Sequence, residues 1–128
     1  NDAEEAMYMA RAKDQNGDSI TSKHTYELHF PPGQTPPARY FWSLTVYDQD
    51  ANLMLNDYDR YAISGNSEDL IYEDDGSLRI LIGGKPPEGM VGNWLPAGES
   101  FTRITLRVYG PEKAMIERTW KPPQLKRL

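Results

Sequence analysis

The densest group of side chains that could do chemistry lies between residues 48 and 59. Asp48, Asp50 and Asn52 alternate at its start, and it carries further acidic and amide side chains toward its end. Oxygen ligands of this kind are what calcium and magnesium prefer in proteins. The spacing therefore makes this segment a candidate cation site.

The acidic segment departs from the best-known calcium loop at two places. An EF-hand needs glycine at its sixth position and glutamate at its twelfth, where this chain has Leu53 and Asp59. A hairpin turn closed by Asp and Asn side chains explains the same residues. We therefore predict no metal site and no cofactor. If calcium or magnesium does bind, the candidate ligands are Asp48, Asp50 and Asn52.

The other residues with catalytic chemistry are poorly placed for it. Glu73–Asp75 are three adjacent acids on a turn, whereas the paired carboxylates of a glycosidase face each other across a cleft. His24 and His29, the two histidines of the chain, fall on opposite faces of a continuous strand. No serine has the Gly-x-Ser-x-Gly context of an activated nucleophile. We assign no catalytic residue.

Aromatic and arginine side chains are better candidates for a binding site. Aromatic rings stack on sugars and other flat apolar ligands, and phenol and indole groups add directional hydrogen bonds. Guanidinium groups hold anionic or hydroxylated ligands through paired N–H donors. The predicted ligand-binding residues are Trp94, Tyr47, Arg60, Tyr61 and Arg107. The alternative is that these side chains fill the core or cover the outside of a sheet.

Strands must position these side chains. Tyr26, Leu28 and Phe30 alternate with polar residues, which indicates a half-buried strand. The longest strands are expected over 40–48 and 101–109, which are rich in β-branched and aromatic residues. Seven or eight such segments between about residues 24 and 120, separated by Gly and Pro, predict a mostly β, antiparallel sandwich of jelly-roll type.

The N-terminal segment predicts a different element. Alanine, methionine and glutamate dominate residues 3–13, and all three are good helix formers. Asp2 is a suitable N-cap. We expect one short helix here, before the first strand.

Size and charge limit the function classes. The 128 residues form one predicted domain, 1–128, and the net charge of −5 argues against a nucleic-acid partner. The absence of cysteine excludes disulfides and thiol chemistry. No apolar run approaches the roughly 20 residues that span a bilayer, and no signal peptide is visible. We expect a soluble protein, cytoplasmic or periplasmic. The start at Asn1 is compatible with a lost upstream segment.

Three phrases carry a family resemblance: Arg39–Asp48, Asn93–Gly98 and Leu106–Pro111, with Arg60-Tyr61 and Asp75-Gly76-Ser77 between them. Their order and spacing resemble the bacterial family catalogued as domain of unknown function 1214. The resemblance implies a jelly-roll β-sandwich that often follows a second uncharacterised domain, numbered 1254. It supplies no catalytic residues.

Three functions follow as hypotheses. The first is a non-enzymatic β-sandwich module that binds a small ligand, a glycan or a companion domain. The second is a metal-dependent hydrolase or lyase that uses the acidic segment from Asp48 to Asp59. The third is a structural domain that forms homo-oligomers through exposed strand edges.

Overall fold

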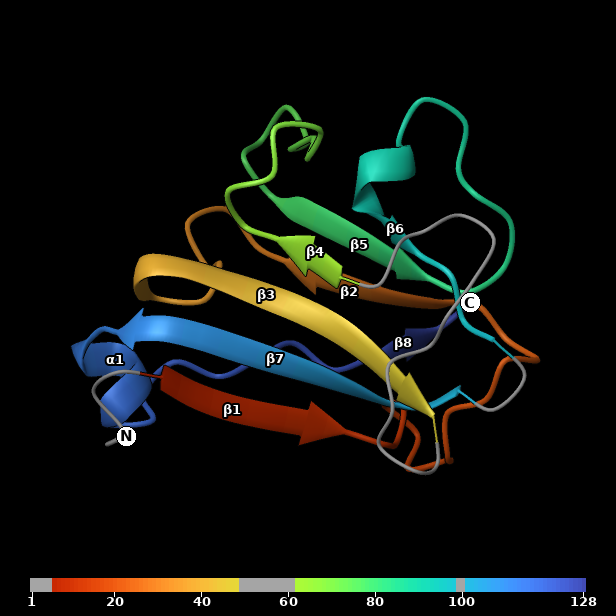
Figure 1. The fold of residues 1–128 in the computed structure, drawn as a ribbon, viewed down its shortest axis with the longest axis horizontal. Coiled ribbons are helices and arrows are strands. Elements are labelled where there is room, and N and C mark those ends of the chain that lie inside the picture. The colour runs from red at the N-terminus through yellow and green to blue at the C-terminus, as the bar shows by residue number, and fades with distance from the viewer. Residues whose placement is uncertain (1–5, 49–61, 99–100) are drawn as a thin grey trace.

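The computed structural model describes residues 6–48, 62–98 and 101–128 (Figure 1). Within these ranges the chain is mostly β, with very little helix. The elements are β1 (Ala6–Arg11), β2 (Tyr26–Phe30), β3 (Ala38–Asp48), β4 (Ala62–Ser64), β5 (Leu78–Ile82), the 3-10 turn η1 (Val91–Asn93), β6 (Trp94–Leu95), β7 (Phe101–Pro111), α1 (Lys113–Ile116) and β8 (Lys126–Arg127).

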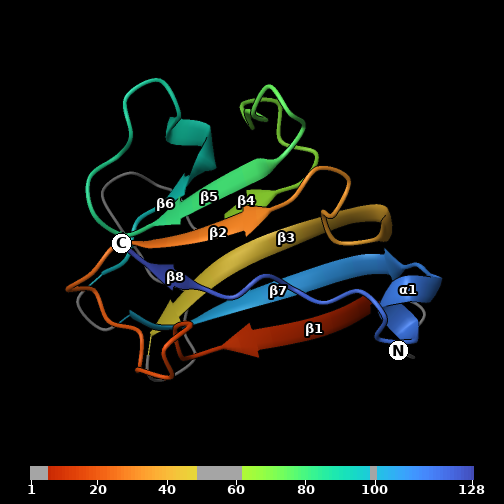
Figure 2. The same cartoon turned by 180° about the vertical axis from the view of Figure 1, so that it is seen from behind.

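The strands form two open, four-stranded sheets, seen from both sides in Figures 1 and 2. The first has the order β1-β7-β3-β4 and is antiparallel throughout. The second has the order β6-β5-β2-β8, in which only β5 and β6 are parallel among the described pairs. The prediction of a mostly β domain is confirmed. The finer prediction of a jelly-roll is not established by these two open sheets.

Both sheets contribute to one apolar core. Leu44 of β3 and Leu106 of β7 are partners in register, and both are buried, at 2% and 6% exposure. The rings of Phe30 and Trp42 bring the two sheets together, with centroids 5.8 Å apart. The predicted alternation is therefore confirmed for the middle of these strands, where the side chains of Trp42, Leu44 and Val46 and of Ile104, Leu106 and Val108 join the core.

The predicted N-terminal helix is wrong. Residues 6–11 form strand β1, which pairs with β7 from Ala6↔Tyr109 to Arg11↔Ile104. Helix propensity is a weak prior that tertiary context overrides. Here Met7 and Met9 pack against the core. Residues two positions apart lie on the same face of a strand but not of a helix, so only a strand lets both methionines contact the core.

The one α-helix of the described residues lies near the other end of the given sequence. It is the single turn α1, directly after β7. The chain then runs past the predicted limit at residue 120 and ends in β8, which pairs with β2. Neither helical segment of the described residues is long and apolar enough to cross a membrane.

Candidate functional site

The first sheet has a polar and aromatic face opposite the core. Alternation turns Thr45 and Tyr47 of β3 outward, together with Arg103 and Arg107 of β7. The pairing register places Tyr47 beside Arg103 and, on the other side of β7, Tyr8 beside Arg107. Three adjacent strands thus bring the five side chains together. We call Tyr8, Thr45, Tyr47, Arg103 and Arg107 the outer-face cluster.

Arg107 is at the centre of the outer-face cluster. Its guanidinium carbon lies 5.5 Å from the ring centroid of Tyr8 and 5.6 Å from that of Tyr47. One terminal nitrogen donates to the Thr45 hydroxyl at 3.3 Å, and the other donates to the Tyr47 hydroxyl. Two rings and two hydroxyls therefore fix the plane of this cation, which lowers the entropy lost when it binds a ligand.

Arg103 adds a second cation to the same surface. Its guanidinium carbon lies 5.3 Å from the ring centroid of Tyr47. Its Nε is buried and has no hydrogen-bond partner in the described part of the chain. A buried donor without a partner is costly, so the Arg103 Nε is an unsatisfied group within this face of the sheet.

The charge of the outer-face cluster is uncompensated within the described ranges. There the ion pairs join Arg79 to Glu27 and Glu73, and Lys113 to Glu117, and none involves Arg103 or Arg107. The cluster contains no carboxylate and no histidine, which are the usual proton carriers in catalysis. Its members are two forked cations, two aromatic rings and hydroxyl groups.

Two of the five predicted ligand-binding residues meet in the outer-face cluster. Tyr47 and Arg107 are in direct contact. Arg60 and Tyr61 lie outside the described residues, and their role stays a prediction.

Trp94 lies elsewhere, on β6 in the second sheet. Its side chain is 1% exposed, and its indole N–H donates to the Gly83 carbonyl oxygen at 2.9 Å. Trp94 thus belongs to the other sheet and its N–H binds backbone of this domain, so it does not join the outer-face cluster. We therefore leave Trp94 out of the site.

Asn93, next to Trp94, is a structural residue. It is fully buried, and its amide nitrogen donates to the carbonyl oxygens of Ile71 and Arg79 at 2.8 and 2.9 Å. Its side-chain oxygen accepts from the backbone N–H of Ile71 at 2.9 Å. One side chain thus ties the segment before β5 to the end of η1.

The candidate cation ligands stay untested. Asp50 and Asn52 lie outside the described residues, and of Asp48 only the backbone, at the end of β3, is described. In the ranges that are described, no three His, Asp or Glu side chains gather as a metal site would require.

Sequence analysis missed Tyr8 because the segment that carries it was predicted to be a helix. The alternation Ala6-Met7-Tyr8-Met9 was the available signal for a strand, with the methionines on one side and the tyrosine on the other. The contact between Arg103 and Tyr47 depends on the pairing of β3 with β7, which the sequence does not show.

The fold and the outer-face cluster define a two-sheet β domain with an arginine–tyrosine face. A family model described as "Protein of unknown function (DUF1214)" matches residues 5–113. The chain belongs to this family, as its sequence phrases predicted. No curated protein matches the chain.

Solved structures of similar fold include proteins from Vibrio parahaemolyticus and Burkholderia cenocepacia. The VPA0106 protein from Vibrio parahaemolyticus is 26% identical, with a TM-score of 0.84, over 98% of this chain and 31% of that one. A putative uncharacterized protein from Burkholderia cenocepacia is 18% identical, with a TM-score of 0.59, over 97% of this chain and 29% of that one. The chain thus spans less than a third of the length of either protein. A position after a domain numbered 1254 stays a prediction.

Proposed function

We propose that this domain is a non-enzymatic binding module and that the outer-face cluster binds an acidic saccharide. The observation that carries the proposal is Arg107, held between the rings of Tyr8 and Tyr47. A planar cation in this position forms paired hydrogen bonds with a carboxylate. The exposed ring of Tyr8, 61% accessible, offers a stacking surface for a sugar.

The shape of the surface favours a saccharide over a compact small molecule. The outer-face cluster lies on three neighbouring strands of an open sheet, whereas small molecules bind in concave pockets. Arg103 and Arg107 lie four residues apart on the same strand, and their guanidinium carbons lie 5.3 and 5.6 Å from the centroid of the same Tyr47 ring. Two carboxylates of one short chain could reach both cations.

Calorimetry with digalacturonate and its neutral counterpart, galactobiose, tests the proposal. We expect the acidic disaccharide to bind more tightly and to lose affinity as salt is added. Arg107→Gln should lower its affinity at least about tenfold, because a hydrogen bond to a charged group contributes roughly 1.5–3 kcal/mol. Arg39→Gln, at the far end of β3, is the matched control. Equal affinity for the two sugars, or no effect of Arg107→Gln, would contradict the proposal.

Docking of a companion domain on the same face is a second candidate. It is favoured by the two solved relatives, in which the matching segment makes up 31% and 29% of the chain. Arginine and tyrosine are also enriched in protein interfaces. In the VPA0106 protein, hydrogen exchange on the strands that match β1 and β7 should then be slower in the whole protein than in the isolated segment. Equal exchange in both would argue for the saccharide.

A further inference from the structure

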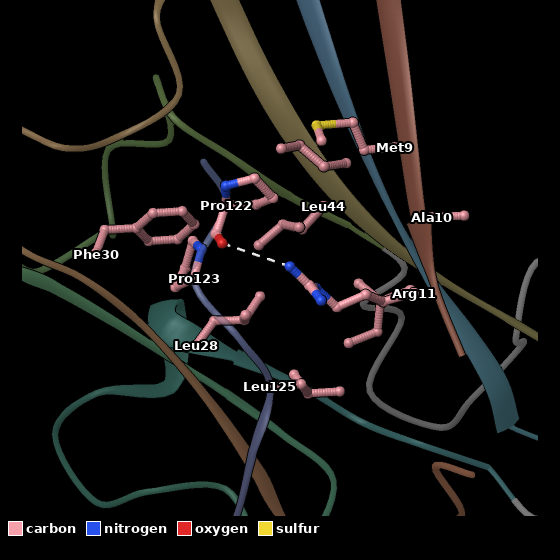
Figure 3. Close-up of a pocket in the computed structure, with 11 residues that line it drawn as sticks. Met9, Ala10, Arg11, Leu28, Phe30, Leu44, Pro122, Pro123 and Leu125 are labelled. Atoms are coloured by element: carbon pink, nitrogen blue, oxygen red, sulfur yellow. Dashed lines mark hydrogen bonds between the residues drawn. The ribbon is translucent and has the colours of Figure 1, made fainter. Parts of the chain in front are cut away.

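A separate pocket opens between the two sheets, on the core side of β1 (Figure 3). Its volume is about 260 Å³. Its walls come from both sheets and from the C-terminal segment, and they include Leu44 of β3, Leu28 and Phe30 of β2, and Leu125. These side chains make the lining mostly apolar.

Arg11 is the one charged side chain among the residues that line this pocket. The alternation that packs Met7 and Met9 against the core also turns Arg11 inward, opposite Ile104 of β7. A terminal nitrogen of Arg11 donates to the Pro122 carbonyl oxygen at 3.4 Å, and this contact orients the guanidinium toward the pocket (Figure 3). A long hydrogen bond to a neutral carbonyl compensates this cation only weakly.

No carboxylate of the described residues forms an ion pair with Arg11. Asp14, three residues on, uses one oxygen to accept from the backbone N–H groups of Asn16 and Asp18, at 2.8 and 3.1 Å. The C-terminal wall carries further exposed cations at Lys121, Lys126 and Arg127. The surroundings of the pocket therefore favour an anion, although the whole chain is negative.

The size of the pocket narrows the class of ligand. A dry apolar cavity of about 150 Å³ takes benzene, and pockets for drug-sized ligands begin near 300 Å³. A volume of about 260 Å³ lies between these values. It suits an apolar body slightly larger than benzene, such as a short acyl chain.

We propose that this pocket binds a small carboxylic acid with an apolar body. The acyl chain or ring lies among Leu28, Leu44 and Leu125, and the carboxylate pairs with Arg11. The site is on the opposite face of the first sheet from the outer-face cluster, so the proposal does not depend on saccharide binding.

A rival explanation is that Arg11 protects an exposed strand edge. The strand β1 is at the edge of its sheet, and an inward-pointing charge is one of the devices that prevent edges from pairing between chains. This explanation predicts that removal of the charge promotes association of the protein and leaves ligand binding unchanged.

The test is a titration of the protein, labelled at its leucine and methionine methyl groups, with octanoate and with octanol by NMR. The two probes have the same chain length and differ in charge. We expect shifts of the Leu28, Leu44 and Leu125 methyl signals and an affinity for octanoate at least tenfold above that for octanol. Equal affinities, or no shifts at these methyl groups, would overturn the proposal.

Two variants and a control complete the test. Arg11→Gln should lower octanoate affinity at least tenfold and leave octanol binding unchanged, whereas Arg39→Gln should change neither. Met9→Phe, which adds volume to the pocket wall, should weaken both probes with its melting temperature preserved. If Arg11→Gln keeps full octanoate affinity, whether or not the variant protein associates, Arg11 only protects the strand edge. The proposed site is then refuted.

Discussion

Trp94 and Tyr47 are both buried aromatic residues outside the central core cluster, one in each sheet, and their neighbours differ in kind. The side chains of Trp94 and the adjacent Asn93 form hydrogen bonds with backbone groups of this domain. Tyr47 instead contacts side chains, and two of these are cations. The first arrangement holds loops and strands together. The second collects charge on one face, which is the property a binding surface needs.

This difference shows that the most conspicuous sequence motif of the chain marks a structural element and not the candidate binding site. The Asn-Trp-Leu-Pro phrase at residues 93–96 is easily recognised, and it fixes architecture. The outer-face cluster has no contiguous phrase, because its members come from β1, β3 and β7. Four predictions test this contrast.

The largest effect is expected for Trp94→Ala. The substitution leaves a cavity and removes the donor to the Gly83 carbonyl, so the free energy of unfolding should fall by about 3–5 kcal/mol. Urea denaturation measures it. Trp120→Ala is the control, because Trp120 is only partly buried. If the two variants lose the same stability, Trp94 has no special structural role.

Asn93→Ala should have the next largest effect. It removes three hydrogen bonds, from the Ile71 N–H and to the carbonyl oxygens of Ile71 and Arg79, and each such bond contributes about 0.5–1.5 kcal/mol. We expect a loss of about 2–4 kcal/mol in the same denaturation experiment. The exposed Asn66→Ala should change stability by less than about 0.5 kcal/mol. A loss at Asn93 no larger than at Asn66 would contradict the structural role.

Tyr47→Phe should have a smaller effect on stability and a clear one on binding. The ring remains and only the acceptor for Arg107 is lost, so stability should fall by about 1 kcal/mol. Digalacturonate affinity should fall severalfold, because Arg107 is less firmly oriented. Tyr109→Phe, whose ring stacks on Phe41 at 4.5 Å, is the control. If the two variants bind digalacturonate with equal affinity, Tyr47 has no role in binding.

The smallest effect concerns the turn before β5. Hydrogen bonds from the Ser77 side chain and backbone hold the pKa of the Asp75 carboxyl below its ordinary value. A lowered pKa means that this contribution to stability is present above the pKa of the unfolded chain and is lost as pH falls through the folded-state pKa. Asp75→Asn should slightly flatten the decline in stability below about pH 4. A melting series from pH 2 to pH 6 measures it, and an unchanged slope would contradict the assignment.

The sequence predicted the parts of the fold that depend on local alternation. The strands around Leu28, Leu44 and Leu106 follow from period two alone, and all three residues are buried. The N-terminal strand did not follow, because its residues favour a helix and only pairing with β7 makes them extended. Of the outer-face cluster, Tyr47 and Arg107 were predicted from side-chain chemistry. Their contact, and the part played by Tyr8, depend on register between strands far apart in the chain.

The pairing of β1 with β7 also has a consequence for how the chain folds. Ala6 pairs with Tyr109, so β1 finds its partner strand only after the residues up to the end of β7 have been synthesised. We expect its alanines and methionines to favour a transient helical turn until then, because unfolded chains retain local structure. We expect closure of this long-range pair to set the folding rate, since non-local contacts slow the search for the native state.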